Sequence, residues 1–95
     1  MAHVAFRAEL VDAGEHLLVQ KEQLRRAVAR LERDPEVGKP LVRELAGCRS
    51  IRVGGSENRL VYRHHRDAEL VEVIAIERRR DDAAYDIATR RFSET

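Results

Sequence analysis

The sequence lacks the features that would place it in a membrane or outside the cell. Cys48 is its one cysteine, so no disulfide can form within the chain, which fits a reducing compartment. No apolar run approaches the roughly 18 residues that a transmembrane helix needs. The opening residues, MAHVAFRAEL, show no basic segment followed by a long apolar one, as a secretory signal would. We therefore expect a cytoplasmic protein that does not bind membranes.

Common enzyme signatures are also missing. The sequence has no Gly-x-Ser-x-Gly, no phosphate-binding glycine loop, no Cys-x-x-Cys and no paired carboxylates flanked by histidine. His64 and His65 are adjacent in an expected strand, so they point to opposite faces and are poorly placed to share a metal ion. We interpret both as solvated and expect no metal and no cofactor. If the protein is an enzyme, it works with arginines.

Net charge is small and lysine is scarce, but arginine is abundant. The 18 basic and 17 acidic residues give a net charge of +1, and only Lys21 and Lys39 are lysines. Residues 48–66 contain five arginines and a single acid, Glu57. Arginine makes planar, bidentate contacts to phosphate. The local excess therefore indicates an anionic partner, although the overall charge does not.

The pattern of apolar residues predicts one α+β domain over residues 1–95, in the order β-α-α-β-β-β-α. We expect a small, mainly antiparallel four-stranded sheet, with an N-terminal helical hairpin on one face and a C-terminal helix. The most apolar strand, ELVEVIAIE, belongs centrally in that sheet. Residues 34–48 read as a loop with a short turn at 41–45. The expected strands are 2–8, 49–54, 58–65 and 69–77, and the expected helical segments are 9–18, 21–33 and about 82–91.

Strand alternation places Arg52 and Arg59 close together across a hairpin. Like charges directly opposite each other destabilise a sheet, so an anionic ligand would offset their repulsion. The segment ERRRDDAAY adds further arginines at the junction between the last strand and the last helix. Tyr85 follows one turn into that helix and offers an aromatic face on which a base could stack. The candidate RNA-binding arginines are Arg49, Arg63, Arg78 and Arg80.

A plainer interpretation competes with this one. Most surface arginines form solvated ion pairs that contribute little stability. We assign that role to Arg30, Arg33, Arg66, Arg90 and Arg91. Tyr85 alone would more often be a packing residue, and Cys48 is expected to be small and buried.

The segments LAGCRSIRVGGSENRLVYRH and VEVIAIERRRDDAAYDIATRR resemble the RelE/ParE superfamily of bacterial toxins, most closely the RelE-type ribonucleases. The resemblance implies metal-independent mRNA cleavage in the ribosomal A site, by attack of a ribose 2′-OH on the adjacent phosphate. It also implies a type II toxin that is a monomer alone and a hetero-oligomer with its antitoxin. The expected partners are the ribosome, mRNA and an antitoxin whose acidic, amphipathic helix covers the basic face or displaces the last helix.

The resemblance also assigns roles to individual residues. It makes Arg59 the phosphate clamp, Arg79 the general acid to the leaving 5′-oxygen, and Tyr85 the residue that stacks on a nucleotide. Arg52 stands where the family often has a lysine that stabilises the phosphorane. Developing charge on phosphoryl oxygens is well met by fixed guanidinium donors.

Two positions depart from the family pattern. Ser50 replaces a second lysine that has been proposed as the base, and Glu77 replaces a frequent glycine. The remaining candidate bases are His64, if a bulge shifted its face, or a water molecule. Two alternatives stay open: a ParE-like inhibitor of DNA gyrase, and a catalytically degenerate module that only binds an antitoxin.

Overall fold

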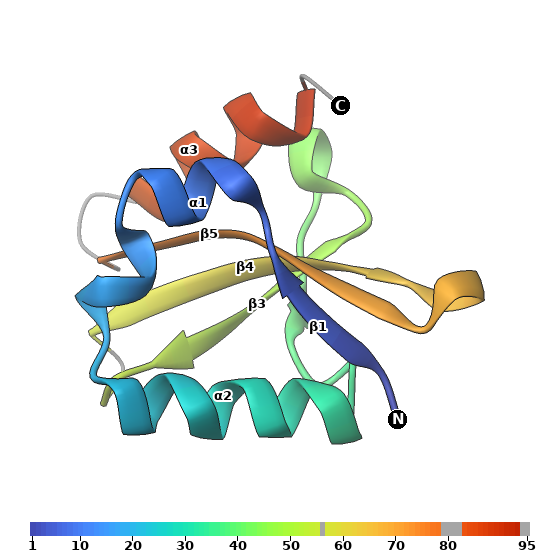
Figure 1. The fold of residues 1–95 in the computed structure, drawn as a ribbon. Helices are drawn as coiled ribbons and strands as arrows, with labels where there is room; N and C mark the ends of the chain where they lie inside the picture. The colour runs from blue at the N-terminus through green and yellow to red at the C-terminus, as the bar shows by residue number, and fades with distance from the viewer. Residues whose placement is uncertain (56, 79–82, 94–95) are drawn as a thin grey trace.

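The computed structural model describes residues 1–55, 57–78 and 83–93, without the side chains of residues 83 and 84 (Figure 1). It confirms the α+β class and the predicted order of the main elements. The strands are β1 (His3–Phe6), β2 (Lys39–Pro40), β3 (Cys48–Val53), β4 (Asn58–His65) and β5 (Leu70–Arg78). The helices are α1 (Ala8–Asp12), α2 (Lys21–Arg33) and α3 (Ala83–Ser93), with 3-10 turns η1 (Glu15–Leu18), η2 (Arg43–Leu45) and η3 (Arg66–Ala68).

The described strands form one five-stranded sheet in the order β1-β5-β4-β3-β2. β1 runs parallel to β5, and the other neighbours are antiparallel. The prediction of four strands missed β2, which is only two residues long and ends at a proline. The apolar strand β5 lies inside the sheet as expected, although β4 occupies the central place.

The N-terminal helical region differs from the prediction of one segment over 9–18. α1 ends at Asp12, and the chain turns at Gly14 before η1 begins. Gly14 has a φ of 71°, a left-handed conformation that glycine adopts without steric cost. The turn lets η1 leave the line of α1 and contact β5.

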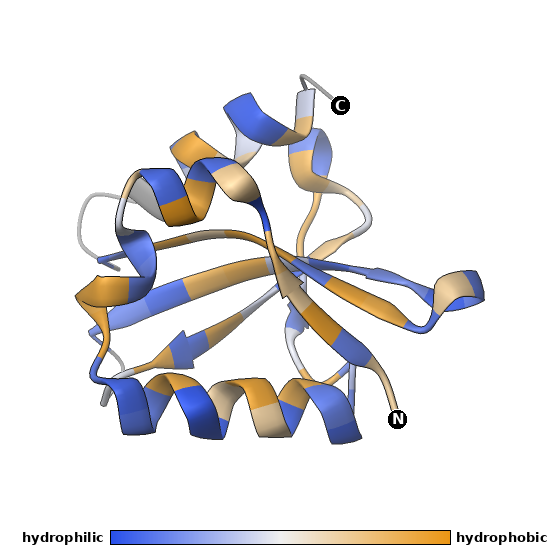
Figure 2. Ribbon diagram, in the orientation of Figure 1, coloured by the Kyte–Doolittle hydropathy of each residue, from blue (hydrophilic) through white to orange (hydrophobic). Residues whose placement is uncertain are grey.

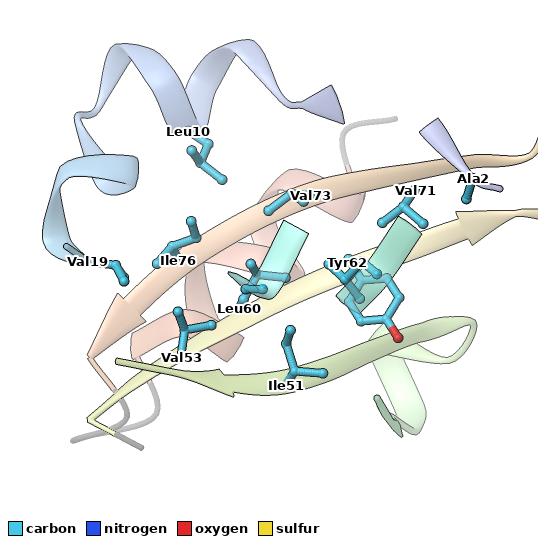
Figure 3. Packing of buried hydrophobic residues seen from close by; sticks show 12 residues of the cluster. Ala2, Leu10, Val19, Ile51, Val53, Leu60, Tyr62, Val71, Val73 and Ile76 are labelled. Carbon is cyan, nitrogen blue, oxygen red and sulfur yellow. The ribbon is translucent and has the colours of Figure 1, made fainter. Parts of the chain in front are cut away.

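Two separate apolar cores lie on opposite faces of the sheet. α2 covers one face and α3 the other (Figure 1). Apolar and polar segments alternate along α2, as expected for a helix with one buried side (Figure 2). Its buried residues Ala27 and Leu31 join Leu10, Leu60 and Tyr62 in the larger core, part of which is seen in Figure 3. The smaller core, under α3, includes Cys48, Val61, Ile74, Ala75 and Ala88.

A β-bulge in β5 changes which way its last residues point. Along β4, Val61 pairs with Ala75 while the next residue, Tyr62, pairs with Val73. Ile74 is therefore the extra residue, and both it and Ala75 belong to the core under α3. Alternation resumes one residue out of step, because two successive side chains share a face. Each residue of β5 after the bulge therefore points to one face of the sheet, whereas unbroken alternation from the start of β5 would point it to the other face.

The edge of β5 beyond the end of β1 is closed by an ion pair. The backbone N–H of Ile76 donates to Oε1 of Glu15, at 3.1 Å. Arg91 of α3 donates to the Ile74 carbonyl at 2.8 Å and to Glu15 Oε1 at 3.0 Å. The expectation from the sequence that Arg91 is a solvated arginine is wrong, since its side chain is 12% exposed and that of its partner Glu15 is 4% exposed. The contact ties η1, β5 and α3 together.

None of the helices in the described part of the chain is both long and apolar enough to cross a bilayer.

Candidate functional site

Arg59 and Tyr85 come together on the α3 face of the sheet. The guanidinium carbon of Arg59, on β4, lies 4.5 Å from the centroid of the Tyr85 ring, on α3. A guanidinium at this distance is attracted by the electron-rich ring face. The sequence predicted that these residues belong to one site, and the structure places them in direct contact. The contact occupies one face of the ring.

The side chain of Ser50 also contacts that of Tyr85. The two hydroxyl oxygens are 3.4 Å apart, and Ser50 is buried. Tyr85 is also partly buried against the smaller core. The ring is thus oriented by β3, β4 and its own helix, so it is held rather than free on the surface.

Arg52 lies directly opposite Arg59 in the β3–β4 register, as strand alternation predicted. Neither guanidinium forms an ion pair within 4.0 Å with any described residue. Arg52 is exposed and Arg59 is half-buried. Two unpaired like charges in adjacent strands form a surface that attracts anions.

The other arginines that the sequence singled out divide into separate groups. Arg63 lies four residues along β4 from Arg59, with its guanidinium carbon 5.4 Å from the Phe92 ring centroid. Arg78 is exposed at the end of β5. Arg79 and Arg80 lie outside the described residues. We therefore base the geometry of the site on Arg52, Arg59 and Arg63.

Arg49 does not share the face of the sheet on which Arg52, Arg59 and Arg63 lie. It pairs in register with Tyr62, whose ring lies in the larger core on the α2 side. Its Nη1 donates to the carbonyl oxygens of Glu36 and Gly38, at 3.0 and 2.8 Å. Its Nη2 lies 3.6 Å from the Glu36 carboxylate. The contacts of Arg49 therefore hold the 36–38 loop against the sheet.

The two histidines are half-buried, so the interpretation of them as solvated is wrong. Nε2 of His65 is 3.0 Å from Glu72 Oε1, and Nδ1 of His64 is 3.4 Å from Glu36 Oε2. The extra residue of the bulge is on β5, so His64 does not change face. No group of three or more potential metal ligands was found within the described residues.

A hollow of about 500 Å³ lies next to Tyr85, between α3 and the segment around η2. Its walls include Leu41, Val42 and Leu45, with Asp86 and Thr89 on the helix side. Val42 is 73% exposed, an unusual position for a large apolar side chain. Periodicity could not have revealed this hollow, because its loop wall has no regular repeat. Its size suits a small planar ligand beside the Tyr85 ring.

Glu77 is a site residue whose placement the sequence did not predict. It pairs in register with Arg59, on the α3 face. Burial raises the pKa of the Glu77 carboxyl, and the nearby Glu15 carboxylate raises it further. A hydrogen bond to the backbone at Arg78 and the charge of Arg91 oppose this rise in pKa. Glu77 thus puts an acid next to Arg59 in the sheet.

Comparisons with known proteins place this site in a family context. Residues 3–83 match the family model of the ParE toxin of type II toxin–antitoxin systems, parDE. No curated protein sequence matches the chain. The toxin–antitoxin complex RelBE2 of Mycobacterium tuberculosis contains a chain that is 33% identical, with a TM-score of 0.67, covering 84% of this chain and 93% of that one.

Structures of the Escherichia coli toxin RelE share the fold. An arginine-to-alanine double mutant of RelE in the free state is 23% identical, with a TM-score of 0.75, and the match covers 96% of this chain and 98% of that one. The toxin in the intact E. coli RelBE toxin–antitoxin complex is 21% identical, with a TM-score of 0.67, over 82% of this chain and 96% of that one.

Proposed function

We propose that this chain, which belongs to the RelE/ParE superfamily of type II toxin–antitoxin toxins, is a ribosome-dependent endoribonuclease that cuts mRNA. The attacking group is the ribose 2′-OH of the substrate, and the products are a cyclic phosphate or 3′-phosphate and a free 5′-OH. The observation that carries the proposal is the stack of Arg59 on Tyr85, next to the unpaired Arg52. A phosphate binder and a base-stacking ring are thereby held side by side.

The arrangement suits phosphodiester cleavage because negative charge builds up on the phosphoryl oxygens during the reaction. Fixed guanidinium donors stabilise that charge without having to reorganise. Arginine stays protonated at neutral pH, so it acts mainly through its charge and hydrogen bonds rather than as an acid or base. Arg59 and Arg52 would grip the phosphate, while the exposed side of Tyr85 and the neighbouring hollow would take a base.

We further propose that an antitoxin neutralises the protein. Similar chains of E. coli and M. tuberculosis are described in toxin–antitoxin complexes. An antitoxin with an acidic, amphipathic helix would complement the arginine-rich face of the sheet. Covering Arg59 or displacing Tyr85 would each inhibit the toxin.

In vitro translation tests the ribonuclease proposal. Purified protein is added to ribosomes stalled on a defined mRNA, and primer extension reveals cuts in the A-site codon. Arg59→Ala should lower the cutting rate by about 10²–10³-fold, as the loss of one fixed donor does elsewhere. Arg79→Ala tests the role that the family resemblance gives to that residue. The control is Arg33→Ala, an exposed arginine at the end of α2. Intact mRNA on ribosomes that have bound folded protein would contradict the proposal.

A gyrase inhibitor is the second candidate, because the matching family model is that of ParE and because Ser50 stands in the place of a lysine. Inhibition of gyrase has no evident need for the contact between Arg59 and Tyr85. Gyrase–DNA cleavage complexes and a DNA-damage response, with intact mRNA, would favour it.

A further inference from the structure

The proposed reaction needs a group that takes the proton of the attacking 2′-OH, and few described residues can supply one. The hydroxyl of Ser50 is neutral and contacts the hydroxyl of Tyr85. His64 is five residues along β4 from Arg59, which corresponds to about 17 Å of extended chain. His65 is further still and contacts Glu72. Neither histidine is placed to act beside Arg59, and a neutral serine hydroxyl is a poor proton acceptor.

The β5 bulge turns a carboxylate toward the site. Val71 and Val73 point into the core on the α2 side, so regular alternation would send Glu77 to that side too. The extra residue, Ile74, shifts the alternation, and Ile76 instead joins that core. Glu77 then points to the α3 face, where Arg59 and Tyr85 meet. Bulges of this kind often re-aim a side chain next to an active site.

The register puts Glu77 within reach of a substrate held by Arg59. Residues directly opposite each other in an antiparallel pair have Cβ atoms about 4.5–5.5 Å apart. Glu77 nevertheless forms no ion pair within 4.0 Å with any residue of the described ranges. Glu77 therefore lies opposite the proposed phosphate-binding arginine in the sheet and is not neutralised by an ion pair within those ranges. It is the only acid in register with the arginine pair of the described hairpin, as Arg52 and Arg59 face each other.

The groups around Glu77 make its carboxylate more basic than an ordinary one. Partial burial and Glu15 of η1 raise the pKa of Glu77, while Arg91 of α3 and the backbone at Arg78 act against the rise. Arg59 of β4 faces it across the strands. A general base works best when its pKa lies near the working pH, so a shift in this direction helps proton removal.

We infer that Glu77 is the general base of the proposed reaction. It would take the role proposed for the family's lysine, whose position Ser50 occupies in this chain. This inference rests on the proposed ribonuclease function. The 2′-OH gives its proton to a Glu77 carboxylate oxygen while the bond from O2′ to phosphorus forms. The bond from phosphorus to O5′ breaks, and O5′ takes a proton from water. The hydroxide that remains is neutralised by the proton that Glu77 releases, and the products are a 2′,3′-cyclic phosphate and a 5′-OH.

The test measures the single-turnover cutting rate on stalled ribosomes from about pH 5 to about pH 8, with ribosome binding recorded separately. Wild type should cut faster as the pH rises through the titration of the base and then reach a plateau. Glu77→Gln should cut about 10²-fold more slowly or worse, lose that pH dependence and bind ribosomes as before. Glu77→Asp, which keeps the carboxylate, should recover part of the rate. Glu57→Gln, which alters an exposed carboxylate in the turn between β3 and β4, is the matched control.

The outcomes separate the two proposals. If wild type cuts mRNA and Glu77→Gln cuts equally fast, or keeps the same pH profile, the assignment of Glu77 is overturned while the ribonuclease function stands. If wild type leaves the mRNA intact, both are overturned. Circular dichroism and thermal melting of Glu77→Gln establish that a slow variant is folded.

Discussion

At neutral pH the charge of Glu77 destabilises the folded state, because its carboxyl is partly buried and lies near the Glu15 carboxylate. A carboxyl whose pKa is higher in the folded than in the unfolded chain binds its proton more tightly when folded. The stability it confers is fully present below the unfolded pKa, about 4.3 for glutamate, and is lost as the pH rises through the folded pKa.

Glu77→Gln should therefore raise the melting temperature near pH 7 and leave it almost unchanged at about pH 3, below the titration of an ordinary glutamate. Thermal unfolding of both proteins at the two pH values measures this difference. The same variant is expected to be more stable and less active, a combination that a purely structural glutamate would not produce. A melting temperature that rises equally at both pH values would contradict the argument, and Glu57→Gln serves as the exposed comparison.

At the scale of elements, the position of α3 depends on the contact between Arg91 and Glu15. Both side chains are largely buried, and the pair also satisfies backbone groups of Ile74 and Ile76 on the open edge of β5. Nη1 of Arg7 donates in turn to the Arg91 carbonyl, at 3.0 Å. α3 carries Tyr85, so this contact at one end of the helix sets the ring at the other.

Removing one partner of a buried ion pair leaves the other charge uncompensated, which costs about 3–5 kcal/mol. We expect a loss of this size in the free energy of unfolding for Arg91→Ala, measured by urea denaturation. Hydrogen exchange should become faster in α3 before it does in α2, since α2 packs in the other core. The control is Glu22→Gln, which removes only exposed pairs within α2 and should change stability by less than about 1 kcal/mol. A loss no larger than that of the control would show that the contact does not hold the helix.

The elements that follow a simple period were predictable from the sequence, and those set by tertiary contacts were not. α2 begins and ends where its apolar spacing predicted, and so does β4. β2 was missed because two residues carry no period, and the role of Arg91 was missed because its partner Glu15 is 76 residues away. The juxtaposition of Arg52 and Arg59 followed from local hairpin register. The placement of Glu77 could not be predicted in this way, since nothing in the residue pattern indicates the β-bulge in β5.

For the whole molecule, the distribution of charge matters more than its sum. The net charge is +1, yet Arg52 and Arg59 lie unpaired within the described residues on one side of the sheet, while acids such as Glu36 and Glu72 pair with basic groups elsewhere. Binding to an RNA surface through such a cluster releases condensed counterions and weakens with salt.

The proposed binding to stalled ribosomes should therefore weaken steeply as salt concentration rises. Arg78→Gln, at the exposed end of β5, should reduce the slope of log K against log salt by about one. Arg26→Gln removes the same charge from the exposed side of α2 and should leave the slope unchanged. Sedimentation of ribosomes with labelled, cleavage-deficient protein at several salt concentrations gives both slopes. Equal slopes for the two variants would mean that ribosome binding does not use Arg78.

The parallel pairing of β1 with β5 has a consequence for how the protein is made. His3 finds its partner only at Leu70, so the first strand waits through the synthesis of most of the chain before its ladder can form. Translation proceeds at about 5–20 residues per second, which makes this wait several seconds long. Glu15 likewise meets Arg91 only when α3 emerges. The contact between Arg59 and Tyr85 therefore cannot form until β5 and α3 have left the ribosome. Up to that point, the nascent chain is harmless to the ribosome that produces it.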